Sequence, residues 1–299
     1  MRITFNEVRN NKIKSYFLLL FFILLAALLG SVFGLIYGNI YFGIFMTSIF
    51  ALVYSLIVFN SGDKMILAMS GAKLVKKSDY PHLFHTIEGL AIAAGIPVPK
   101  AYVIDDTALN AFATGKNPET ASITVTSGLI NKLKRDELEG VIAHEMSHIK
   151  NYDIRFMMLT AVLIGVVTLL SDFLLRSFLW GGMRRNSRDN NNMTLILILL
   201  GFVLAILTPL IGQMVKLAIS RKREFMADAS GAELTRYPQG LANALKKISH
   251  DPDPLVDKAN KATAHLFIST PFRKKRSIMT RLFSTHPPIQ ERIKRLEEM

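Results

Sequence analysis

The chain has 299 residues, no cysteine and a formal net charge of +13, from 36 basic and 23 acidic residues. Half of the residues are hydrophobic and the mean hydropathy is +0.30, which is typical of a chain with membrane segments. The lack of cysteine excludes a disulfide framework and a thiolate metal site. No nucleic-acid-binding motif is present, so we expect the basic charge to flank membrane segments and the partner to be a lipid bilayer rather than nucleic acid.

Residues 15–62 contain no charged side chain. This run is about twice the roughly 20 apolar residues that one helix needs to cross the hydrocarbon core, and Gly38 and Asn39 favour a turn near its middle. We therefore predict two spans, Tyr16–Tyr37 and Tyr41–Phe59. Basic residues lie before and after the run and none lies in the turn, which places both ends in the cytoplasm. A cleavable signal peptide is the alternative, but a second span follows at once.

The stretch from Lys73 to Asn151 has the composition of a soluble domain. Its pattern predicts small helices around a short sheet, at whose edge a peptide could add as an extra strand. The expected helices are Tyr80–Ala94, Ser127–Leu133 and the helix that starts near Arg135, and the expected strands are Ala101–Ile104 and Ser122–Thr126, with Leu109–Gly115 between them.

The central feature is an H-E-x-x-H motif on the last of these helices, formed by His144, Glu145 and His148. Imidazoles four residues apart project from one helix face, so both can reach one metal ion, with the glutamate beside the open coordination position. The alternative is a chance match on a solvated helix face. A catalytic zinc ion requires a third protein ligand, which must come from one of five further histidines or from a carboxylate.

A second uncharged region follows in two runs, Phe156–Ser171 and Met193–Val215, which we interpret as another hairpin. Its connecting loop carries three arginines and would lie outside the cell, against the positive-inside trend. The hairpin therefore either spans the bilayer or only dips into it.

The helix that leaves this region carries Glu224 and, one turn later, Asp228, and we expect it to continue to about Leu234. Glu224 could be the third ligand, with Asp228 holding the outer N–H of a zinc-bound imidazole. The alternative is an acidic residue that pairs with Arg221 or Lys222 on a solvated helix. Beyond it we expect helices at Gly240–Ser249 and Ile289–Glu298, separated by a basic segment, Asp251–Ser284, that is either a solvated loop or a flap over the cleft.

Five sequence features together resemble the HtpX-type membrane heat-shock proteases, gluzincins related to the CAAX prenyl endopeptidases. They are H-E-M-S-H at 144–148, Asn151 with Asp153, E-F-M-A-D at 224–228, N-A-F-A-T-G at 110–115 and H-P-P-I-Q-E-R at 286–292. The resemblance covers nearly the whole chain.

The resemblance implies one Zn²⁺ per chain, held by His144, His148 and Glu224, with Glu145 as general base. It also implies Asp228 beside a zinc-bound histidine, and His286 and Arg292 as donors to the developing oxyanion. Asn110, Ala111 and Phe112 resemble the edge strand that pairs with the substrate backbone.

We therefore expect a mainly α membrane protein of α+β type, with two transmembrane helical hairpins and a cytoplasmic gluzincin-like zinc metalloprotease domain that contains a small sheet. Residues 1–62 and 156–216 would be the hairpins, and residues 63–155 and 217–299 the two parts of the protease domain. The expected function is hydrolysis of membrane or misfolded proteins at the bacterial inner membrane, with both termini in the cytoplasm.

Two other classes of function compete with this interpretation. One is an intramembrane zinc protease, against which the charged residues around the motif argue. The other is a non-enzymatic zinc-binding or transport protein, although the uncharged runs contain no histidine or carboxylate.

Overall fold

The structure is a computed structural model. It describes residues 2–36, 38–163, 221–251, 266, 268 and 287–299. Most of the second hydrophobic hairpin expected at 156–216 lies outside the described residues, as does most of the segment expected between Asp251 and Ser284. Within the described part, a helix begins at Asp153 and is described as far as Leu163.

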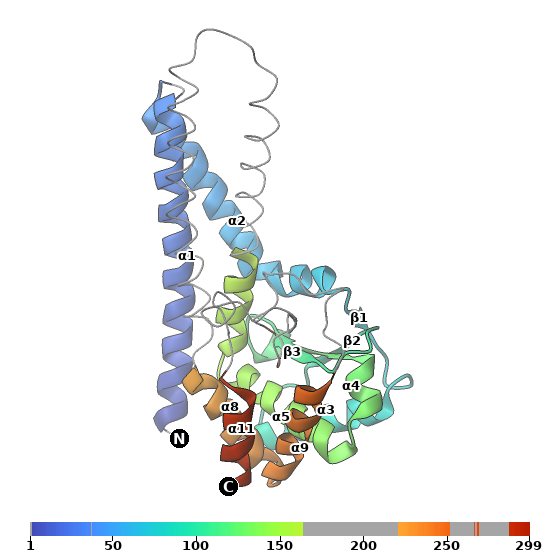
Figure 1. The fold of residues 1–299 in the computed structure, drawn as a ribbon. Helices are drawn as coiled ribbons and strands as arrows, with labels where there is room; N and C mark the ends of the chain where they lie inside the picture. Colours follow the sequence, from blue (N-terminus) through green and yellow to red (C-terminus); the bar gives the residue numbers. More distant parts are fainter. Residues whose placement is uncertain (1, 37, 164–220, 252–265, 267, 269–286) are drawn as a thin grey trace.

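The N-terminal hairpin consists of α1 (Arg2–Ile36) and α2 (Ile40–Met69), which lie side by side and project from the described globular part (Figure 1). Gly38 takes a φ of +79°, which glycine adopts without strain, and the Asn39 side chain caps α2 by accepting a hydrogen bond from the Phe42 N–H at 3.0 Å. The predicted turn is confirmed. Both helices are longer than the predicted spans. The extra turns lie at the N-terminal end of α1 and the C-terminal end of α2, where the helices run along the globular part of the chain.

The hairpin exposes large apolar side chains. On α1 they recur every three or four residues along one face, at Ile13, Phe17, Leu20, Leu24 and Leu28, each more than 40% exposed. A soluble monomer rarely leaves so continuous an apolar stripe in water. Both helices are also long and apolar enough to cross a membrane.

A four-stranded sheet forms one layer of the globular part, with the order β1-β2-β4-β3. The β2–β4 pair is parallel and the other two pairs are antiparallel, so β3 lies at one edge. The predicted strands at 101–104 and 122–126 are confirmed, and β1 is an addition that the sequence pattern did not indicate. The strands are β1 (Lys73–Leu74), β2 (Lys100–Ile104), β3 (Ala111–Thr114) and β4 (Ser122–Thr126).

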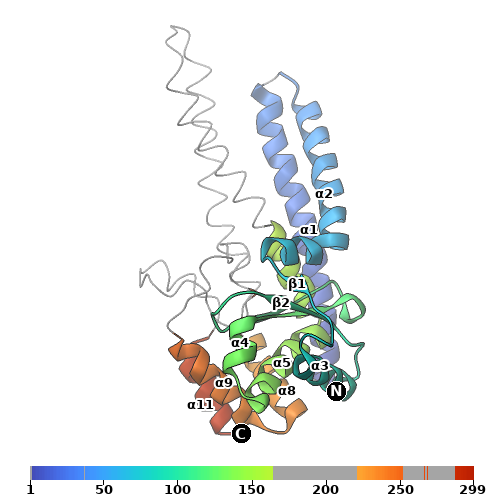
Figure 2. The same cartoon turned by 90° about the vertical axis from the view of Figure 1, so that its right-hand side faces the viewer.

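Helices pack against this sheet around α5, which carries the H-E-x-x-H motif at the centre of the body (Figure 2). It contacts α3, α8, α9 and β3, and it is buried over nearly its whole length. The Glu137 carboxylate accepts a hydrogen bond from the Lys134 N–H at 2.7 Å, which stabilises the first turn. The helices are α3 (Pro81–Ala94), η1 (Pro118–Thr120), α4 (Ser127–Lys132), α5 (Arg135–Lys150), α8 (Arg221–Thr235), α9 (Pro238–His250) and α11 (Ile289–Glu297).

The hairpin is packed against this body and is not merely tethered to it. The Arg155 guanidinium lies 5.5 Å from the ring centroid of Phe59 on α2, and Lys116 Nζ donates to Asn60 Oδ1 at 3.3 Å. These contacts join α2 to two separate segments of the body. The orientation of the hairpin is therefore fixed relative to the motif helix.

Gly140 allows α5 and α9 to approach closely. A Cβ atom at this position would lie 2.5 Å from the Leu241 backbone N and 2.8 Å from its Cα, closer than atoms can pack. We expect Gly140→Ala to separate the two helices and to lower the free energy of unfolding by about 1–3 kcal/mol.

Thermal unfolding of the full chain in detergent measures this change. Gly89→Ala is the matched control, because Gly89 is exposed on α3 and a Cβ atom there would meet no atom within 4 Å beyond its chain neighbours and the backbone of its own helix. Alanine at this position should be neutral or raise stability by up to about 1 kcal/mol. Equal melting temperatures for the two variants would contradict the close approach.

Candidate metal centre

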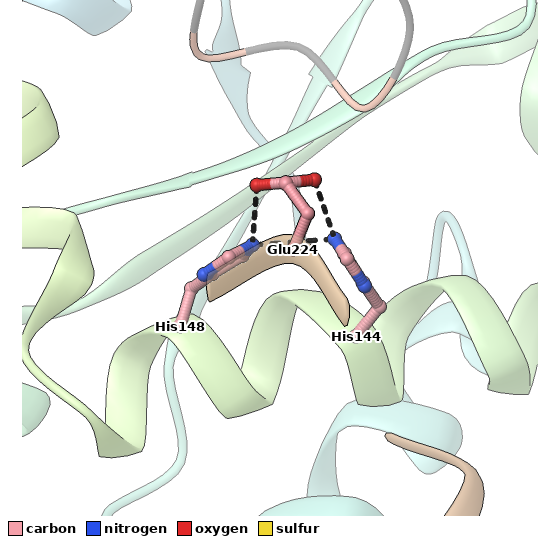
Figure 3. A group of neighbouring side chains, drawn as sticks. All are labelled: His144, His148 and Glu224. Carbon is pink, nitrogen blue, oxygen red and sulfur yellow. Dashed lines mark hydrogen bonds and ion pairs between the residues drawn. The ribbon is translucent and has the colours of Figure 1, made fainter. Parts of the chain in front are cut away.

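The two motif histidines lie one turn apart on α5 with their rings edge to face (Figure 3). Their Nε2 atoms are 3.2 Å apart, and both residues are less than 5% exposed. Two neutral imidazole nitrogens that face each other as acceptors repel, so this arrangement needs a proton or a cation between them. The predicted placement of both histidines on one helix face is confirmed.

Glu224 completes the group from α8, which crosses α5 opposite the two histidines (Figure 3). Its Oε2 lies 3.8 Å from His144 Nε2 and its Oε1 lies 3.6 Å from His148 Nε2. The alternative, an ion pair on a solvated helix, is wrong for Glu224, because this carboxylate is buried whereas Arg221 and Lys222 on the same helix are exposed.

The three donors fit one zinc ion. A tetrahedral ion with ligand bonds of about 2.0–2.1 Å separates its donor atoms by about 3.3 Å. The three donor separations are 3.2, 3.6 and 3.8 Å, so small movements of the Glu224 side chain satisfy that geometry. Two nitrogens and one carboxylate oxygen also match the donor set of a catalytic zinc site.

His144 is oriented by a carboxylate that a buried cation holds in place. Its Nδ1 lies 2.9 Å from Asp228 Oδ1, and Arg292 donates to both oxygens of Asp228, through Nε at 2.8 Å and Nη2 at 2.7 Å. Burial alone would raise the pKa of Asp228, but the guanidinium and the bond to His144 hold that pKa well below its usual range. The carboxylate is therefore ionised and fixes His144 with its Nε2 toward the metal position.

His148 is oriented in the same way by a different carboxylate. Its Nδ1 lies 3.0 Å from Asp153 Oδ2, just beyond the end of α5. Burial lowers the pKa of His148, but the bond to Asp153 and the nearby Glu224 charge outweigh it and raise the pKa to about 9 in the metal-free protein. At neutral pH the metal-free site therefore carries a proton on His148, at the position that a metal ion would take.

Glu145 is buried beside the two histidines and belongs to the same group. Burial raises its pKa, and the charges of His144 and His148 act in the opposite direction. The backbone of Ala113 on β3 adjoins the Glu145 carboxylate and, like the two histidines, acts to lower its pKa. A carboxylate with a raised pKa beside a metal position suits a general base near neutral pH.

The edge strand β3 lies directly over this group, and its outer side carries backbone donors and acceptors. Backbone hydrogen bonds between antiparallel strands use alternate residues. The Asn110 carbonyl bonds to β4, so Phe112 faces β4 as well, and the backbone groups of Ala111 and Ala113 point away from it. The Ala111 carbonyl accepts a hydrogen bond from the Ile268 N–H at 3.0 Å. The strand begins one residue later than the predicted segment, because Asn110 precedes it, although the Asn110 carbonyl still accepts from β4.

Of the two predicted oxyanion donors, the structure describes only Arg292. Arg292 is 1% exposed and engages Asp228, with Nη1 at 3.6 Å from Glu224 Oε2. His286 lies outside the described residues. Their role therefore stays a prediction.

Sequence reasoning gave no role to two residues that the structure places around His148. Asp153 was recognised only as part of a motif, and its bond to His148 could have been suspected from its position five residues beyond the histidine. Asn11 lies in the N-terminal helix and contacts Asp153 across 142 positions of sequence, so no local signal pointed to it.

Comparison with known proteins gives consistent results. Residues 78–299 match the sequence model of Peptidase family M48. Three relatives are each described as a protease HtpX homolog. They come from Dictyoglomus thermophilum (50% identity over 81% of this chain and 77% of the relative), Dictyoglomus turgidum (44%, 99% and 95%) and Streptococcus uberis (41%, 99% and 99%).

Among solved structures, the crystal structure of S. mikatae Ste24p has a similar fold, with a TM-score of 0.51 at 20% identity. The likeness covers 83% of this chain and 57% of that protein, so this chain spans just over half of its length. At this identity the likeness concerns the fold alone.

Removing the third ligand should greatly weaken the zinc site. We expect Glu224→Ala to lower zinc affinity by more than about 100-fold, since even the partners of metal ligands are worth about 10–100-fold. Competition with a chromogenic chelator measures the dissociation constant. Glu233→Ala on the same helix is the control, because Glu233 is exposed. Wild-type affinity in Glu224→Ala would refute the assignment.

Zinc binding should release a proton, because the pKa of His148 is raised to about 9 in the metal-free protein and a metal ligand must be neutral. Below that pKa the proton competes with zinc, so affinity rises with pH until His148 has lost its proton. Isothermal titration calorimetry at pH 7 in two buffers of different ionisation enthalpy should give about one proton released. Equal binding enthalpies in both buffers would contradict this expectation.

Proposed function

The chain belongs to Peptidase family M48, and from this premise we propose that it is a membrane-anchored zinc endopeptidase that hydrolyses peptide bonds of membrane or misfolded proteins. The observation that carries the proposal is the buried zinc site of His144, His148 and Glu224, with Glu145 beside it and a strand edge above it. We place this activity in membrane protein quality control of a bacterial cell.

The metal ion and Glu145 would have different roles in the reaction. When bound, zinc acts as a Lewis acid that activates water and polarises the scissile carbonyl. Glu145 accepts the proton of the attacking water and then delivers it to the leaving amine. The carboxylate lies beside the Ala113 backbone, where the edge of β3 meets the zinc site.

We propose that the substrate binds in extended form along the outer edge of β3. The outward carbonyls of Ala111 and Ala113 are acceptors for an extended peptide there, and main-chain hydrogen bonds of this kind bind a peptide with little dependence on its sequence. This suits a protease that acts on many unfolded chains. The substrate would compete with the Ile268 N–H for the Ala111 carbonyl.

The predicted oxyanion donors complete this proposal. The guanidinium of Arg292 lies beside the Glu224 carboxylate, and an N–H donor there could turn toward charge that develops on the carbonyl oxygen. We assign the same role to His286. Arg292 also holds Asp228, so its replacement would affect both functions.

We propose that the anchor is the hydrophobic hairpin of α1 and α2, together with the second hydrophobic region, and that the protease domain and both termini face the cytoplasm. The exposed apolar stripe on α1 and the basic residues at both ends of the hairpin support this orientation. The motif helix α5 is packed on all sides by protein rather than lipid, which favours this arrangement over an intramembrane protease.

The general base provides the direct test. We expect Glu145→Gln to lower cleavage of unfolded casein by about 10²–10⁴-fold, because the amide cannot accept the proton. Zinc content should stay at one ion per chain, since Glu145 is not a ligand. Fluorescent casein and the full chain in detergent provide the assay, with metal analysis in parallel.

Two controls separate the possible outcomes. A chelator should abolish wild-type cleavage, and added zinc should restore it. Full activity in Glu145→Gln would refute the mechanism, whereas a wild-type protein that binds zinc and cleaves no unfolded or membrane protein would refute the endopeptidase and favour a zinc-binding role.

A further inference from the structure

The two zinc-binding histidines are held by similar carboxylates, but these carboxylates are fixed from different parts of the chain. Asp228 is held by Arg292, whose guanidinium binds both of its oxygens. Asp153 binds His148 through Oδ2, and its other oxygen, Oδ1, faces the N-terminal helix. The group that holds Asp153 therefore comes from the membrane hairpin.

That group is the side chain of Asn11 on α1. Its Nδ2 donates to Asp153 Oδ1 at 2.6 Å and to the Asn151 carbonyl at 3.0 Å, and its Oδ1 faces Arg223 Nη1 at 3.5 Å. Both amide protons and the amide oxygen are thus used. The opposite orientation of the amide would place its oxygen against two acceptors, so the network determines the orientation.

Asn11 is fully buried, and it lies on the basic stretch of α1 that precedes the uncharged run at residues 15–62. A buried amide is costly unless it is fully hydrogen-bonded. If the contact served only to attach the hairpin, an apolar residue could pack there at lower cost. The bonds of Asn11 instead converge on the end of α5 and on Asp153, directly behind a zinc ligand.

We propose that Asn11 is a positioning residue of the zinc site, which fixes Asp153 and through it the His148 ring, so that the first membrane helix is part of the metal centre. The chain of contacts runs from Asn11 Nδ2 to Asp153 Oδ1, and from Asp153 Oδ2 to His148 Nδ1. Arg223, next to the ligand Glu224 on α8, lies 3.7 Å from Asp153 Oδ1 and joins the same cluster.

The inference rests on the zinc site and not on the nature of the substrate. Its readout is metal binding, so it can fail while the proposed proteolysis holds, and it can hold while that proteolysis fails. Replacement of residues that orient metal ligands typically costs 10–100-fold in metal affinity. Loss of the Asn11 amide should fall in that range.

The test uses the full chain in detergent and the variant Asn11→Leu, which keeps a similar volume but cannot form hydrogen bonds. We expect its zinc dissociation constant, measured by chelator competition, to rise at least about 10-fold. The visible spectrum of the Co²⁺-loaded protein should also change, because the orientation of the His148 ring changes. Asn10→Leu is the matched control, since Asn10 is the adjacent residue and is exposed.

A double-mutant cycle separates a positioning role from a merely structural one. If Asn11 acts through Asp153, the 10-fold effect of Asn11→Leu should disappear in an Asp153→Ala background. Asn11→Ser, which keeps a donor, should bind zinc with an affinity between wild type and Asn11→Leu, and it replaces Asn11→Leu in the cycle if the latter does not fold. Wild-type zinc affinity and an unchanged cobalt spectrum in Asn11→Leu, or effects of the two mutations that simply add, would overturn the proposal.

Discussion

The zinc site depends on one electrostatic constraint. To bind the metal, the unprotonated Nε2 atoms of His144 and His148 must face each other across 3.2 Å inside the protein. Each ring can do so only if its other nitrogen is held as a donor by a fixed acceptor. Asp228 and Asp153 are these acceptors. A buried carboxylate in turn needs a donor or a cation, because an ion taken out of water without a partner is very costly.

This requirement spreads the site over the chain. The ligand histidines come from α5 and the third ligand from α8, while the partners of the two carboxylates come from α11 and α1. Arg292 holds Asp228 with a charged guanidinium, and Asn11 holds Asp153 with a neutral amide. The difference matches the surroundings: Arg292 faces two acidic residues, Asp228 and Glu224, whereas Asp153 already has Arg223 near it. A second cation beside Asp153 would add repulsion.

The membrane hairpin and the protease domain therefore form one structural unit. Arg155 and Lys116 bind the α2 side of the hairpin, and Asn11 binds from α1 to the end of the motif helix. These contacts also fix the zinc site relative to the two helices that are long and apolar enough to cross a membrane.

The sequence by itself determined the features that depend on local spacing. The H-E-x-x-H face, the turn at Gly38, the strand at 122–126 and the one-turn separation of Glu224 and Asp228 follow from helix and strand periodicity, which is encoded within a few residues. The choice of Glu224 as third zinc ligand, rather than one of the five remaining histidines, needed a family resemblance, because sequence distance does not select a third ligand. Only the tertiary structure decided which residue holds each carboxylate. Asn11 lies 142 positions from Asp153 and Arg292 lies 64 positions from Asp228. Contacts across such separations depend on how the elements pack in three dimensions, and no local pattern records them.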